Sequence, residues 1–67
     1  IARAIIDRHE VLTEFLRIFE IDEETIYRDV EGMEHHVSRA SLDAIRAVTE
    51  CLRQSPAMRA EVRKRMG

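Results

Sequence analysis

The segment Asp22–Ser38, DEETIYRDVEGMEHHVS, predicts an amphipathic helix between two helix caps. Asp22 can accept hydrogen bonds from the free N–H groups at a helix start, and Glu23 and Glu24 in the first turn suit the positive end of the helix dipole. Ser38 can cap a following helix in the same way. Apolar residues recur along one side at helical spacing, and they are Ile26, Val30, Met33 and Val37. We therefore expect one helix along this segment and another after it.

Three further helices are expected around this segment, which predicts an all-α fold, a small bundle of about four helices. The first runs from about Ala2 to Phe19 and has a wide apolar face that includes His9. The third follows Ser38, and the fourth begins at Ser55-Pro56, a cap followed by proline at the first helical position. The apolar positions of these three helices are, in chain order, Ile5, Leu12, Leu16 and Phe19, then Leu42, Ile45, Val48 and Leu52, then Met58, Val62 and Met66.

The length of 67 residues allows a single domain, residues 1–67. A chain this short buries only about 60% of the surface that its unfolded state exposes, so we expect help from a metal, a partner subunit or both. Because the chain opens inside an apparent helix, we expect it to be a fragment of a longer protein. No apolar run approaches the roughly 18 residues of a membrane span, and no signal peptide is visible. No membrane partner is therefore expected.

The charges are unevenly distributed along the chain. Seven of the thirteen acidic residues lie between Glu20 and Glu34, where Arg28 is the only base. An acidic centre suits a cation, whereas the basic end after Arg53 is read as a solvated helix end rather than a nucleic-acid patch. The single cysteine, Cys51, rules out a disulfide within the chain and fits a reducing, cytoplasmic location. We interpret it as a small core residue rather than a reactive thiol.

Three potential metal ligands share one surface of the second predicted helix. Glu31 and Glu34 are three residues apart, and Glu31 and His35 are four apart, so their side chains are neighbours on a helix. His9 lies about 18 Å from the turn near Ile21 if the first two helices form an antiparallel hairpin, and the other three lie about 15 to 21 Å from it. The levels match, so His9, Glu31, Glu34 and His35 are the predicted ligand set.

This ligand set is rich in oxygen, contains two imidazoles and has no sulfur. It suits Mn²⁺ or Fe²⁺ better than a structural zinc site, and another divalent transition metal stays an alternative. The spacing alone leaves two simpler interpretations open. The acids can form a solvated face with incidental histidines, and His9 can be a hydrogen-bonded residue of the core.

A catalytic role is a further alternative that the sequence disfavours. Glu-x-x-His also occurs in di-iron bundle enzymes, but these carry the motif on two helices together with further glutamates. This chain has one such set, and 67 residues leave little room for a closed substrate pocket. We therefore do not expect an enzyme.

The ligand motifs also carry a resemblance to a known family. Arg8–Leu16 (RHEVLTEFL), Asp22–Tyr27 (DEETIY) and Asp29–Ser38 (DVEGMEHHVS) resemble the helical second domain of manganese-responsive members of the diphtheria-toxin-repressor family. The resemblance covers nearly the whole chain and weakens after about Arg53.

The resemblance implies the dimerisation and metal-binding domain of a homodimeric, metal-activated transcriptional repressor of metal uptake. In that family, a winged helix-turn-helix domain at the N-terminus binds operator DNA, and that domain is absent from this chain. The resemblance matches His9, Glu31, Glu34 and His35 to family ligands, and it places two further acidic ligands in the DNA-binding domain. Iron-type members carry Cys at the position of Glu31 and His at that of Tyr27, which favours manganese. The alternative is a purely structural dimerisation module.

The predicted homodimer is also motivated by apolar surface. The first two helices carry more apolar residues than two short following helices need to cover, and these are Leu12, Leu16, Phe19, Ile26 and Val30. We expect dimerisation without metal, because all four predicted ligands can come from one chain. We expect no operator binding by these 67 residues alone.

Overall fold

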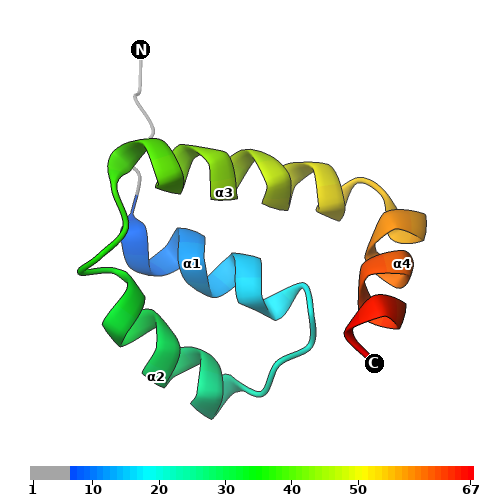
Figure 1. Cartoon of the computed structure of the whole chain (residues 1–67), viewed down its shortest axis with the longest axis horizontal. Coiled ribbons are helices and arrows are strands. Elements are labelled where there is room, and N and C mark those ends of the chain that lie inside the picture. Colours follow the sequence, from blue (N-terminus) through cyan, green and yellow to red (C-terminus); the bar gives the residue numbers. More distant parts are fainter. Residues whose placement is uncertain (1–6) are drawn as a thin grey trace.

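The computed structural model describes residues 7–67, which form four helices and no strand. These are α1 (Arg8–Arg17), α2 (Glu23–Met33), α3 (Arg39–Arg53) and α4 (Pro56–Met66). The helix α1 lies in the middle, with α2 along one side and α3 along the other, while α4 turns away from the end of α3 (Figure 1). The all-α prediction of about four helices is therefore confirmed. None of these four helices combines the length and apolar character that a membrane crossing needs.

The starts of the last three helices are those that the sequence predicts. The side chains of Asp22, Ser38 and Ser55 accept hydrogen bonds from the backbone N–H three residues further on, at distances of 3.0, 3.1 and 3.3 Å. Pro56 occupies the first turn of α4, where its missing N–H costs no helical hydrogen bond.

The start of α1 differs from the prediction of a helix from Ala2 to Phe19. Residues 1–6 lie outside the described part, but Asp7 is extended, and its carboxylate accepts from the N–H groups of His9 and Glu10. An aspartate that bonds to the backbone in this way begins a helix rather than continuing one. The helix ends at Arg17, and a turn follows in which Glu20 has a φ of 58°.

The core joins α1, α2 and α3 through four fully buried side chains, Leu12, Ile26, Val30 and Leu42. Packed around them are the partly buried Val11, Leu16, Ile21, Met33, Val37 and Ile45. The predicted stripe of the second helix is thus confirmed as a packing surface. Its last member, Val37, reaches the core from the link between α2 and α3, because α2 already ends at Met33.

Two residues of α3 were assigned to the wrong side. Val48 was predicted in the core and is 49% exposed, while its neighbour Thr49 is 4% exposed. The Thr49 hydroxyl donates to the Ile45 carbonyl at 2.7 Å, so burying it leaves no polar group without a partner. Cys51 was also predicted in the core but is exposed, because it lies away from the side of α3 that packs on α1.

The apolar surface available to a second copy also differs from the expected set. Leu12, Ile26 and Val30 are at most 1% exposed and are covered within the chain, whereas Leu16 and Phe19 are partly buried. The large apolar side chains exposed in the described residues are Tyr27, Val48, Met58 and Met66.

Candidate metal centre

His9 and Glu34 approach each other across the pair formed by α1 and α2. Asp7 caps α1 just before His9 and so places this histidine in the first turn, while Glu34 is the C-cap residue of α2. The distance from His9 Nδ1 to Glu34 Oε1 is 3.4 Å. The antiparallel register predicted from the sequence brings these two residues together.

The pair is accessible to solvent. The His9 side chain is 47% exposed and the Glu34 side chain is 27% exposed. His9 is therefore no hydrogen-bonded core residue, and that interpretation is wrong. The Arg8 guanidinium beside it donates to the Val37 carbonyl, which ties the start of α1 to the link after α2.

Glu31 and His35 do not join this pair. Glu31 is exposed in the last turn of α2, and His35 is exposed in the turn that follows the helix. The predicted common helical surface required the helix to continue through His35, but it ends at Met33. Among residues 7–67, no group of three or more His, Cys, Asp or Glu side chains is arranged to hold a metal ion.

Gly32 lies in the last turn of α2 before this site. A methyl group added at its Cα would meet no atom within 4 Å, so close packing of a neighbouring backbone is not the reason for a glycine here. Its carbonyl accepts hydrogen bonds from the N–H groups of Glu34 and His35 and so helps to end the helix.

The His9–Glu34 pair supplies one nitrogen and one oxygen donor whose spacing is compatible with one divalent metal ion. Nitrogen and oxygen ligands lie about 2.0 to 2.2 Å from a transition-metal ion, so two donors on one ion are at most about 4.4 Å apart. The observed 3.4 Å lies within this limit. The residues present thus fit two positions of a metal coordination sphere.

A shallow groove of about 140 Å³ runs along α1 and α2 beside His9. Its other lining residues are Thr13, Arg17, Glu23, Ile26 and Tyr27. The groove extends from His9 to a second polar contact between the same two helices, the one between Arg17 and Glu23.

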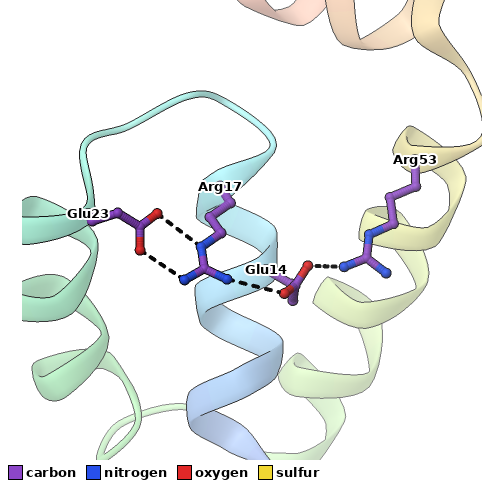
Figure 2. Close-up of polar contacts among 4 residues, drawn as sticks. All are labelled: Glu14, Arg17, Glu23 and Arg53. Carbon is purple, nitrogen blue, oxygen red and sulfur yellow. Dashed lines mark hydrogen bonds and ion pairs between the residues drawn. The ribbon is translucent and has the colours of Figure 1, made fainter.

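That second contact is a bidentate ion pair that the sequence interpretation missed. Arg17 Nε and Nη2 donate to the two carboxylate oxygens of Glu23, both at 2.9 Å (Figure 2). On its other side, Arg17 Nη1 is 3.5 Å from Glu14, which also accepts from Arg53 on α3. The hairpin register that places His9 opposite Glu34 also places Arg17, at the end of α1, opposite Glu23 at the start of α2.

The electrostatics of this end are dominated by these hydrogen bonds. Those from Arg17 hold the pKa of Glu23 below its ordinary value, and the same contact raises the pKa of Arg17. Hydrogen bonds from the Thr25 backbone and hydroxyl lower the pKa of Asp22. Asp22 and Glu23 therefore keep their negative charges to lower pH, and Arg17 keeps its positive charge to higher pH.

Comparisons of the sequence with known proteins give clear matches. The family described as "Iron dependent repressor, metal binding and dimerisation domain" matches residues 1–62. The HTH-type transcriptional regulator MntR of Bacillus subtilis is 41% identical over 63 residues, which are 94% of this chain and 44% of that protein. The MntR of Lysinibacillus sphaericus is 43% identical over 56 residues, or 84% of this chain and 40% of that protein.

A third relative, MntR of Bacillus velezensis, is 56% identical over 45 residues, which are 67% of this chain and 32% of that protein. The chain thus spans less than half the length of these curated relatives. No solved structure gives a significant match.

Proposed function

This chain belongs to the iron-dependent repressor family of metal-binding and dimerisation domains, and we propose that it is the metal-sensing and dimerisation domain of a Mn²⁺-dependent transcriptional repressor. The proposed ligands are His9, Glu31, Glu34 and His35. The proposed regulator controls metal uptake and binds operator DNA through an N-terminal winged helix-turn-helix domain outside these 67 residues. It has no catalytic role.

The observation that carries this proposal is the contact between His9 and Glu34. His9 lies in the first turn of α1 and Glu34 caps the end of α2, and their donor atoms are 3.4 Å apart. An exposed histidine held beside a carboxylate at a helix end supplies one nitrogen and one oxygen donor to an incoming cation. Glu31 and His35 are exposed close by in sequence, so their side chains can turn toward the ion without leaving a packed core.

The donor set favours manganese among the divalent metals. The two carboxylates are hard oxygen donors that suit Mn²⁺, and the set contains no sulfur, while the two imidazoles make Fe²⁺ the nearest competitor. When bound, the ion supplies positive charge that removes the repulsion between Glu31 and Glu34. It also joins α1 to the end of α2, so metal binding stabilises the folded hairpin.

The proposed partners follow from the family and from the relatives. The family description includes dimerisation, which supports a homodimer. The relatives are called HTH-type transcriptional regulators, which supports a DNA partner for the whole protein. A regulator that binds bacterial DNA works in the cytoplasm, and a cytoplasmic location is part of the proposal.

The competing function is a structural dimerisation module that has lost metal sensing. It is favoured by the positions of Glu31 and His35, which do not join the His9–Glu34 pair. Operator-binding measurements on the full-length protein separate the two functions. Mn²⁺ should increase the affinity of the sensor for operator DNA, whereas an affinity that is the same with Mn²⁺ and with chelator supports the structural module.

The dimer is tested separately by sedimentation equilibrium of the 67-residue chain in the presence of chelator. We expect a dimer at micromolar concentration, because the four proposed ligands belong to one chain and metal is not needed to join two. A monomer would contradict this part of the proposal. We also expect no specific DNA retention by this chain, since its acidic centre repels phosphate.

A further inference from the structure

The pair formed by α1 and α2 is tied by polar contacts at both ends. His9 and Glu34 meet at one end, and Arg17 and Glu23 meet at the other. We propose that the ion pair between Arg17 and Glu23 is a positioning device that holds α2 in the register needed for His9 and Glu34 to share a metal ion. This inference rests on the proposed metal site and adds to it two residues that do not touch the ion.

The geometry of the contact suits a positioning role. Two parallel hydrogen bonds of 2.9 Å fix both the distance and the orientation of the Glu23 carboxylate, which one ammonium contact would not do. Glu14 holds the remaining side of the Arg17 guanidinium, and Arg53 of α3 binds Glu14 in turn (Figure 2). The start of α2 is thereby connected through α1 to α3.

The position of α2 depends mainly on α1. Among the described helices, α1 is the only one whose backbone lies next to that of α2. Ile26 and Val30 hold α2 from the core side. On the outer side, the two helices are separated by the shallow groove that His9, Arg17 and Glu23 line. The ion pair is the polar contact that closes this groove at the end opposite His9.

The neighbouring glutamate provides a matched control. Glu24 follows Glu23 in the first turn of α2, and its carboxylate is also exposed, at 76% against 67%. However, Glu24 pairs with Arg28 four residues along the same helix at 3.1 Å, so its ion pair does not cross to α1. Glu23→Gln and Glu24→Gln therefore remove the same charge near the same helix end, and only the first removes a contact between helices.

The experiment compares both variants with the wild type in the full-length protein. Mn²⁺ affinity is measured by the electron paramagnetic resonance signal of the free ion, and backbone hydrogen exchange is measured without metal. We expect Glu23→Gln to weaken Mn²⁺ binding about three- to fivefold and to speed exchange in α2 but not in α3. Glu24→Gln should leave both measurements close to wild type. Arg17→Lys, which keeps the charge but loses the fork, should fall between Glu23→Gln and the wild type.

The possible results distinguish this inference from the proposed function. Equal Mn²⁺ affinities for Glu23→Gln and wild type would overturn the positioning role while leaving the metal site intact. An equal loss in Glu24→Gln would also overturn it, because the effect would then come from charge alone. A wild-type protein that does not bind Mn²⁺ would overturn the proposed function and the inference together.

Discussion

Leu12 is the residue whose truncation tests the relation between the core and the metal most sharply. It has no exposed surface and belongs to one cluster with Ile26 and Val30 of α2 and Leu42 of α3. Replacing a buried leucine with alanine costs about 2 to 5 kcal/mol. A chain of 67 residues has a total stability of about 3 to 10 kcal/mol. Leu12→Ala should therefore remove a large share of the stability of the metal-free protein and lower its urea midpoint.

Metal should restore much of this loss. A ligand that binds only the folded state stabilises it by about 2.7 kcal/mol at a free concentration one hundred times its dissociation constant. The urea midpoint of Leu12→Ala should thus rise when Mn²⁺ replaces the chelator. Leu12 is not one of the proposed ligands, so this variant keeps all four of them.

Val48→Ala is the matched control for this experiment. Its side chain is 49% exposed on α3, and its truncation should change stability by no more than about 0.5 kcal/mol. Urea titrations of both variants, with chelator and with Mn²⁺, give the comparison. Equal midpoints for the two metal-free variants would refute the placement of Leu12 in the core. A Leu12→Ala midpoint that does not respond to Mn²⁺ would refute the coupling between metal and fold.

Three further predictions follow from single positions. Glu31→Cys should shift metal preference from Mn²⁺ toward Fe²⁺, Co²⁺ or Zn²⁺, because a thiolate is softer than a carboxylate; competition titrations check this, and an unchanged order excludes Glu31 as a selectivity ligand. Glu20→Gly should raise the free energy of unfolding by up to about 1 kcal/mol, because glycine adopts the left-handed backbone at this position without strain. The variant also loses the exposed ion pair between Glu20 and Arg63, which reduces this gain; a lower melting temperature would show that the loss of the ion pair outweighs the relief of strain. The pKa values of Asp22 and Glu23 are lowered from ordinary values of 3.8 and 4.5, so their contribution to folding stability is complete above about pH 4.5 and is lost as the pH falls further. The double variant Asp22→Asn, Glu23→Gln should therefore lose less melting temperature than the wild type when the pH falls below about 4.5. An equally steep fall of the melting temperature in both proteins would contradict the assignment.

The starts of α2, α3 and α4 could be predicted because their signals are local. Asp22, Ser38 and Ser55 each bond to an N–H within their own helix, so neighbouring residues suffice to recognise them. The end of α2 was harder to predict from the sequence, because Val37 continues the apolar spacing after the helix has ended at Met33. Apolar spacing indicates which residues reach the core, but such a residue can lie in a link between helices rather than in a helix.

The side of α3 that is buried could not be read from hydrophobicity alone. Val48 and Cys51 are more apolar than Thr49, but the packing of α3 on α1 buries Thr49 and exposes the other two. Thr49 can be buried because its hydroxyl finds a carbonyl acceptor one turn earlier. This hydrogen bond is local to α3, but which side of α3 is buried depends on its packing against α1, which sequence periodicity does not contain.

The candidate site was also predicted only in part from the sequence. His9 and Glu34 could be paired because the register of an antiparallel hairpin follows from residue counts along two helices. The contribution of Glu31 and His35 stays a prediction, since the end of α2 at Met33 removes the helical spacing that placed them together with Glu34. The ion pair between Arg17 and Glu23 follows the same hairpin register but carries no motif that draws notice in a sequence.

The most direct test of the central claim is a Mn²⁺ titration of the wild-type protein beside His9→Ala and Glu34→Ala. Both side chains are partly exposed, so their removal should leave the circular dichroism spectrum unchanged. Loss of either ligand should weaken Mn²⁺ binding by about tenfold or more. The account predicts a wild-type protein that binds Mn²⁺ and two folded variants that bind it much less. Identical titrations for all three proteins would contradict it.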